Sequence, residues 1–141
     1  KDYLPMWLRE REIETRQVEP VDLLKAEKLP PYRSTWMKPT GKLPADERIH
    51  QALLLYVSDM GLLGAAVNPH EVNFMSKKFQ SASLDHVMWF HGKVNFNNWI
   101  LHHMHSPISQ NARGFSRGSI YTKSGKLVAS TAQEGLMRIW D

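Results

Sequence analysis

The alternation of hydrophobic and polar positions predicts one helix in the middle of the chain. Between residues 46 and 68, apolar side chains recur at spacings of four and three, at Ile49, Leu53, Tyr56, Met60 and Leu63. This period places them on one face of a long helix. Asp46 supplies an N-cap, and Asn68-Pro69 ends the helix unless Gly61 or Gly64 breaks it earlier.

The rest of the chain predicts β-strands. Period-two alternation, β-branched and aromatic residues, and flanking Gly or Pro residues mark six segments, at 12–18, 32–39, 83–91, 99–105, 112–122 and 127–139. Gly125 allows a hairpin between the last two. Two strands before a helix and a run of strands after it define an α+β fold, in which a curved antiparallel sheet wraps around the helix.

Composition excludes several classes of protein. The 141 residues are 42% hydrophobic and 23% charged, as in an ordinary globular domain, and no apolar run approaches the length of a membrane span. The net charge of +4 comes from basic residues scattered among acids, so we expect no nucleic-acid partner and no membrane insertion. Cysteine is absent, which excludes disulfides and a thiol nucleophile. Because the sequence opens on Lys1 without an initiator Met or targeting segment, we expect a piece of a longer protein.

Asp59 is the first candidate for chemistry. On a helical wheel it lies within or beside the apolar face, between Ala52 and Leu55. Burying an unpaired carboxylate costs on the order of several kcal/mol, and such groups gather at functional sites. The alternative is that Asp59 lies at the edge of the stripe and reaches water, or caps a helix break before Gly61.

Two further segments carry polar groups. The string Ser83-Leu84-Asp85-His86 invites comparison with serine hydrolases, but a continuous strand would put Ser83 and Asp85 on one face and His86 on the other. No G-x-S-x-G elbow accompanies it. Gln133 follows a run of small and β-branched residues; if it is buried its amide needs partners, and the alternative is an outward-facing side chain.

Three histidines that lie close together in the sequence, His102, His103 and His105, suggest a metal site. His103 and His105 share a strand face, with His102 on the other, but no third ligand with clear spacing follows. We therefore expect exposed strand histidines and no metal.

Several longer strings together resemble a known family. They are Tyr56-Val57-Ser58-Asp59, Pro69-His70, Ser83-Leu84-Asp85-His86-Val87-Met88-Trp89-Phe90-His91, Ala112-Arg113-Gly114-Phe115 and the run at 129–138, Ala-Ser-Thr-Ala-Gln-Glu-Gly-Leu-Met-Arg. In this order and spacing they resemble the second half of the acyl-CoA thioesterase II family, which includes bacterial thioesterase II and the peroxisomal long-chain acyl-CoA thioesterases. The resemblance covers most of the chain from Tyr32 onward.

The resemblance implies a fold and a set of site residues. Residues 1–141 would form a single hotdog domain, a curved antiparallel sheet around one long central helix, and the C-terminal half of a double-hotdog protein. The catalytic trio of the family, an Asp, a Thr or Ser and a Gln, falls on Asp59, Ser83 and Gln133. The hydroxyl is Ser here, where bacterial members have Thr.

The resemblance also implies an activity. The protein would hydrolyse fatty acyl-CoA to free acid and coenzyme A with one water held by the trio, and would need no cofactor. Its partners would be the acyl-CoA substrate and a second hotdog domain or a homo-oligomer. The location would be peroxisomal or cytoplasmic, although Ile139-Trp140-Asp141 is no peroxisomal tripeptide.

Two other readings stay open. Hotdog hydratases and dehydratases pair an Asp with a His on the helix, but His50 lies nine residues before Asp59, so the two are not helical neighbours. Alternatively, the chain is a non-catalytic half that binds acyl-CoA or only supports the other domain.

Overall fold

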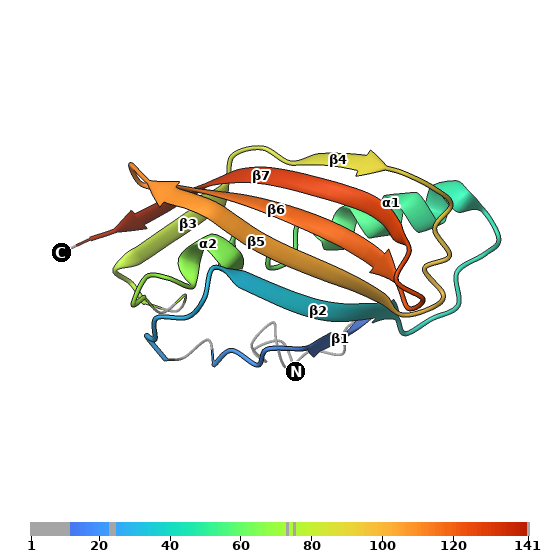
Figure 1. Ribbon diagram of the computed structural model, residues 1–141, viewed down its shortest axis with the longest axis horizontal. Coiled ribbons are helices and arrows are strands. Elements are labelled where there is room, and N and C mark those ends of the chain that lie inside the picture. The colour runs from blue at the N-terminus through green and yellow to red at the C-terminus, as the bar shows by residue number, and fades with distance from the viewer. Residues whose placement is uncertain (1–11, 23–24, 73, 75, 141) are drawn as a thin grey trace, which may run out of the picture.

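A computed structural model describes residues 12–22, 25–72, 74 and 76–140 of the chain. These residues form a seven-stranded antiparallel sheet and two helices (Figure 1). The elements are β1 (Ile13–Gln17), β2 (Tyr32–Pro39), α1 (Glu47–Ser58), α2 (Gly64–Val67), β3 (Phe79–Ser83), β4 (Val87–Phe90), β5 (Ile100–Gln110), β6 (Arg113–Thr122) and β7 (Leu127–Ile139). The sheet order is β1-β2-β5-β6-β7-β3, and β4 also pairs with β7. The expected curved antiparallel sheet around a helix is thus present, and no described helix has the length and apolarity to cross a membrane.

The start of α1 agrees with the prediction, but its end does not. The Asp46 side chain accepts a hydrogen bond from the Arg48 backbone N–H at 3.0 Å, so Asp46 is the N-cap. The helix stops at Ser58, Asp59 is its C-cap, and the short α2 follows after a turn. Gly61 in that turn has a φ of +82°, a conformation that glycine adopts without steric cost. One long central helix is therefore not confirmed, and the break before α2 is the earlier one that the glycines allowed.

The buried face of α1 is the predicted stripe only in part, at Leu53, which is partly buried against the core. Leu54 and Val57 are fully buried, whereas Ile49 and Tyr56 are 41% and 67% exposed. The helix carries apolar residues on two faces, and a helical period identifies a stripe without saying which face the sheet covers. One apolar face of α1 therefore lies in the core, and the other is open on the surface.

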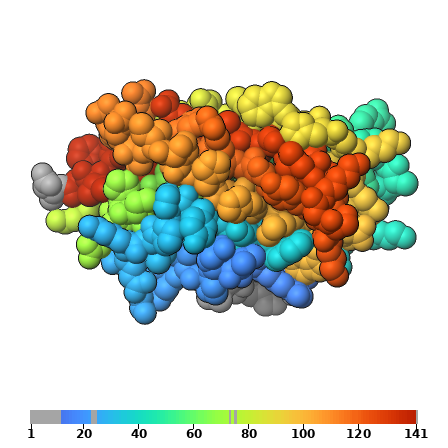
Figure 2. Space-filling view, in the orientation of Figure 1, coloured from blue at the N-terminus to red at the C-terminus, as the bar shows by residue number. Residues whose placement is uncertain are grey.

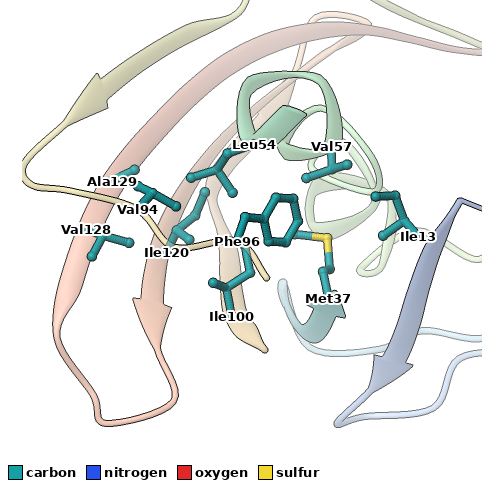
Figure 3. Close-up of a cluster of buried hydrophobic side chains, with 10 residues drawn as sticks. All are labelled: Ile13, Met37, Leu54, Val57, Val94, Phe96, Ile100, Ile120, Val128 and Ala129. Carbon is teal, nitrogen blue, oxygen red and sulfur yellow. The ribbon is translucent and has the colours of Figure 1, made fainter. Parts of the chain in front are cut away.

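The core lies between α1 and the inner face of the sheet. Figure 3 shows Leu54 and Val57 pointing from α1 toward Phe96 and the strand residues around it. The buried members of this cluster are Ile13, Met37, Leu54, Val57, Val94, Phe96, Ile100, Ile120, Val128 and Ala129. At roughly 1.5–3 kcal/mol for each large side chain removed from water, this cluster fixes α1 against the sheet. The packing of α1 on this cluster determines the position of its C-terminal end.

Of the predicted strand over 83–91 only Ser83 and β4 are strand, and most of β3 lies before that segment. Ser83 pairs with Gly135 and Val87 pairs with Ala132, so the three residues 84–86 lie opposite only two residues of β7, 133 and 134. The Leu84 backbone N–H donates to the Glu134 carbonyl at 2.9 Å. An extra residue on one strand of an antiparallel pair bends that strand and redirects its side chains. The expectation that Ser83 and His86 point to opposite faces was wrong for this reason.

Candidate functional site

Asp59 lies where α1 ends, beside the interruption between β3 and β4. Its side chain is 52% exposed, so it is not buried within the apolar face. Of the two readings of the sequence, the one in which Asp59 caps a helix break and reaches water describes its position. The C-terminal end of a helix carries partial negative charge, so a carboxylate gains nothing from its own helix there. The stabilising partners must come from other elements.

Those partners are Ser83 and Gln133. The Ser83 hydroxyl, at the last position of β3, donates to Asp59 Oδ1 at 3.2 Å. The Gln133 side-chain amide, on the inner face of β7, donates to the same oxygen. Gln133 is 1% exposed, so it takes the inward alternative, with a partner for its amide nitrogen but none for Oε1 among the described residues. The structure thus brings together all three residues of the predicted trio, which we call the carboxylate centre.

The two oxygens of the Asp59 carboxylate have different surroundings. Both donors meet at Oδ1, and no described residue makes a hydrogen bond to Oδ2. A carboxylate held through one oxygen presents the other to whatever occupies the neighbouring space. Oδ2 is therefore the oxygen that can accept a proton from a water or ligand.

His86 also faces the centre, a position that the sequence pattern did not reveal. Its Nδ1 lies 3.9 Å from Asp59 Oδ1, and its Nε2 lies 2.8 Å from the hydroxyl of Ser58. Asp85 turns away and accepts from the Glu134 backbone N–H at 2.7 Å. Ser83, Asp85 and His86 do not form a Ser-His-Asp triad, because His86 makes a hydrogen bond to neither of the other two. The sequence signal for His86 was its place in the string after Ser83, which a strand period interpreted wrongly.

A groove beside Asp59 has mixed lining. Its apolar part comes from the turn after α1, from Phe74 and from β3, and its polar part includes one arginine. The lining residues are Arg33, Asp59, Gly61, Leu63, Gly64, Phe74, Ser81, Ala82 and Ser83. Burial lowers the pKa of Arg33, whose Nε and Nη2 both donate to Asn68 Oδ1, at 2.9 and 2.6 Å. The groove therefore offers an apolar wall and a guanidinium near the carboxylate.

The other histidines have different roles. His103 and His105 stack outward with ring centroids 6.4 Å apart. The expectation of an exposed histidine was wrong for His102, which points inward because it alternates with them along the strand, and burial lowers its pKa to about 3. Within the described residues no cluster of three His, Asp or Glu side chains is suited to a metal ion. His50 is buried, with Nε2 2.9 Å from the Pro44 carbonyl and Nδ1 accepting from the Phe96 N–H at 3.1 Å. Both of its nitrogens are thus used by the backbone, which argues against a helix Asp–His pair.

The fold and the site define a class of protein. A curved antiparallel sheet around a helix, with a polar centre where the helix ends, is a hotdog domain. The solved structure of a conserved protein of unknown function with a hotdog fold, from Alicyclobacillus acidocaldarius, superimposes on 90% of this chain with a TM-score of 0.66. The superposition includes 46% of that protein's length, and the two sequences are 15% identical. At this identity the similarity shows the fold alone.

Closer relatives identify the family. The family model for acyl-CoA thioesterase matches residues 7–136, and the chain belongs to that family. Acyl-CoA thioesterase 2 of Haemophilus influenzae is 40% identical over 111 residues, which are 79% of this chain and 39% of that protein. The crystal structure of acyl-CoA thioesterase II TesB2 from Mycobacterium marinum has a TM-score of 0.73 and 32% identity, over 91% of this chain and 49% of that one. The chain thus spans about two-fifths to a half of the length of these relatives.

Proposed function

We propose that this domain hydrolyses fatty acyl-CoA thioesters to a free fatty acid and coenzyme A, with Asp59 as general base. The observation that carries the proposal is the convergence of Ser83 and Gln133 on one oxygen of a half-exposed carboxylate, in a chain of the acyl-CoA thioesterase family. A positioned carboxylate with one free oxygen beside an apolar groove meets the geometric requirement for activating a water.

The proposed reaction needs no covalent acyl-enzyme. A water bound to Asp59 Oδ2 gives its proton to that oxygen while its own oxygen attacks the thioester carbonyl carbon. The tetrahedral intermediate then expels the coenzyme A thiolate, which takes up the proton from Asp59. Water and thioester are thereby converted into acid and thiol, and Asp59 returns to its starting state. General base catalysis of this kind contributes about 10²–10⁴-fold to a rate.

In this proposal Ser83 and Gln133 hold the base. Their hydrogen bonds fix Oδ1, so that Oδ2 has one orientation toward the groove. They lie on two different strands, β3 and β7, so only the folded domain brings both side chains to the end of α1. Fixed orientation of a reacting group avoids a loss of entropy in the transition state.

The test is palmitoyl-CoA hydrolysis, followed by reaction of the released coenzyme A with a thiol reagent. We expect Asp59→Asn to lower kcat by about 10²-fold or more, because Asn cannot accept the proton. Asp46→Asn is the matched control: it makes the same change at the other end of α1, where Asn caps as well as Asp does. Wild-type activity in Asp59→Asn would remove this residue from the mechanism.

We further propose that residues 1–141 are one hotdog domain that packs on a second one, the C-terminal half on the N-terminal half of a longer chain. The open face of α1 exposes Ile49 and Tyr56, the turn after it exposes Met60, and β4 exposes Val87 and Trp89. In Figure 2 the yellow region that contains β4 lies on part of the upper rim of the molecule, and β3 and β4 pair with no described strand other than β7. Large apolar side chains beside an unpaired sheet edge are typical of a surface that a partner covers.

A second copy of this chain has the same exposed surface, so two copies could cover each other there. We expect the isolated chain to self-associate in size-exclusion chromatography with light scattering, and Trp89→Lys to yield the monomer. A wild-type chain that is monomeric at high concentration would contradict this use of the surface.

The same exposed surface favours a second candidate, a non-catalytic half whose partner domain holds the working site. Asp59→Asn in the longer two-domain protein separates the two. Loss of hydrolysis assigns the reaction to this domain, and unchanged hydrolysis assigns it to the other.

For the location we propose the peroxisome or the cytoplasm. Support for the first comes from a relative in Saccharomyces cerevisiae, peroxisomal acyl-coenzyme A thioester hydrolase 1, which is 34% identical over 91 residues, 64% of this chain and 26% of that protein. Imaging the tagged longer protein beside a peroxisomal marker tests this.

A further inference from the structure

His86 is held between Ser58 and the carboxylate of Asp59. Its side chain is 18% exposed, and it lies in the three-residue interruption that also presents Ser83 to the carboxylate. Ser58, the last residue of α1, is fully buried. The imidazole therefore connects the end of the helix to the edge of the sheet at the point where the carboxylate centre is assembled.

The hydrogen bonds of Ser58 determine which nitrogen of His86 carries a proton. The Ser58 hydroxyl donates its single hydrogen to the Leu55 carbonyl at 2.7 Å. It can therefore only accept in its contact with His86, at 2.8 Å from Nε2. In the neutral ring the hydrogen is therefore on Nε2, and only the imidazolium has a hydrogen on Nδ1 as well.

Nδ1 points at the carboxylate centre without a hydrogen bond of its own. It is buried, and no described group lies within hydrogen-bonding distance of it. The distance of 3.9 Å to Asp59 Oδ1 is within reach of an ion pair but too long for a hydrogen bond. A buried polar atom without a partner is unfavourable, and hydrogen bonds in active sites are often long before substrate binds and shorten afterwards.

We propose that His86, as the imidazolium whose Nδ1–H faces Asp59 Oδ1, is a positioning residue for Asp59; this rests on the proposed function of Asp59 as general base. Ser83, Gln133 and His86 all approach Oδ1, from β3, β7 and the interruption before β4. With three groups on one oxygen, the half-exposed carboxylate keeps a single rotamer, and Oδ2 stays directed away from them. Ser58 fixes the ring so that Nδ1, and not Nε2, faces the carboxylate.

Two substitutions separate the roles of the two nitrogens. Gln places its amide nitrogen near the position of Nε2, so His86→Gln keeps the bond to Ser58 and removes Nδ1. Asn places its amide nitrogen near Nδ1, so His86→Asn keeps a donor toward Asp59 and loses Ser58. We expect His86→Gln to lower kcat by about 10–100-fold with little change in KM or in the urea midpoint, because a displacement of about 1 Å has effects of that size. His86→Asn should retain more of kcat than His86→Gln while unfolding at lower urea.

The chain offers a matched control at His91. Its Nε2 also lies 2.8 Å from a serine hydroxyl, that of Ser130, but the residue is exposed and no carboxylate is paired with it among the described residues. His91→Gln should leave kcat unchanged. Wild-type kcat in His86→Gln would overturn the proposal, because His86 would then act only as an anchor for Ser58.

A second readout does not depend on hydrolysis. In long-range ¹H–¹⁵N NMR spectra of the chain we expect the hydrogen of neutral His86 on Nε2, and a change in its Nδ1 signal when Asp59 is replaced by Asn at constant pH. An unchanged Nδ1 signal would overturn the positioning role. A changed signal in a chain that hydrolyses nothing would uphold the contact and count against the proposed reaction alone.

Discussion

Acid should destabilise this fold through one buried histidine, His102. It lies on the inner face of β5, is 0% exposed, and has only a weak contact of 3.5 Å from Nε2 to the Thr131 hydroxyl. Burial, and to a lesser degree the charges of His86 and His103, lowers the pKa of His102 from the usual 6.5 to about 3. The folded protein therefore keeps His102 neutral at pH values where the unfolded chain protonates it.

The sign and size of the effect follow from this difference. Between pH 6.5 and 3 the unfolded state binds more protons than the folded state, so stability falls as the pH is lowered through this window. At pH 5, which is about 1.5 units below the unfolded pKa, His102 should remove about 2 kcal/mol of the free energy of unfolding, at about 1.4 kcal/mol per unit. A typical domain has about 5–15 kcal/mol in total, so the loss is measurable.

Urea denaturation at pH 7.5 and pH 5 measures it. The free energy of unfolding of wild type should fall by about 2 kcal/mol more between these pH values than that of His102→Gln, which has no proton to bind. His105→Gln is the matched control because His105 is on the same strand but exposed, and it should behave as wild type. Equal pH dependence in wild type and His102→Gln would refute the reasoning.

Three further predictions concern packing and the helix end. Leu54→Ala should cost about 2–5 kcal/mol of the free energy of unfolding, because Leu54 is fully buried, whereas Leu55→Ala, at a position 44% exposed, should cost much less; urea midpoints compare the two. Gly118→Ala should destabilise by about 1–3 kcal/mol, since a methyl group there would meet His102 Nε2 and Thr131 Oγ1. Gly41→Ala, with open space around it, is its control in the same titration, and equal midpoints would contradict the packing argument. Asp59→Asn should change the free energy of unfolding by less than about 1 kcal/mol, because Asn keeps an acceptor for both donors and removes a charge from the C-terminal end of α1. A larger loss would mean that its activity cannot be interpreted separately from folding.

The sequence predicted the class of fold well because that depends on local signals. The Asp46 cap, the glycine in the hairpin after β6 and the alternation of β5 to β7 all act over a few residues. The buried face of α1 depends instead on which side the sheet covers. Ile49 and Tyr56 fit a helical period as well as Leu54 and Val57 do, and only the tertiary structure distinguishes the two stripes.

The candidate site could be predicted in its members but not in its geometry. Asp59, Ser83 and Gln133 came from a resemblance to a family, since residues 24 and 74 positions apart have no local pattern that joins them. His86 was part of a noted string, but its place beside Asp59 was not predicted because a strand period assigns it to the wrong face. The extra residue between Ser83 and Val87 appears only when the edge strand is aligned with β7, and one sequence contains no information on that register.

The unfavourable features of this domain are concentrated at one point. Asp59 lies at the negative end of α1, where a carboxylate costs about 0.3–1 kcal/mol. The buried Oε1 of Gln133 and the buried Nδ1 of His86 both lack a hydrogen-bond partner among the described residues. An apolar side chain at position 86 or 133 would remove the unpaired buried atom there, and a basic residue at position 59 would remove the unfavourable charge at the helix end. Stability alone therefore does not account for these three residues. Unfavourable features that gather around one carboxylate are expected at a site where a bound ligand supplies the missing interactions. The free Oδ2 of Asp59, beside the groove, is where that ligand would meet the protein.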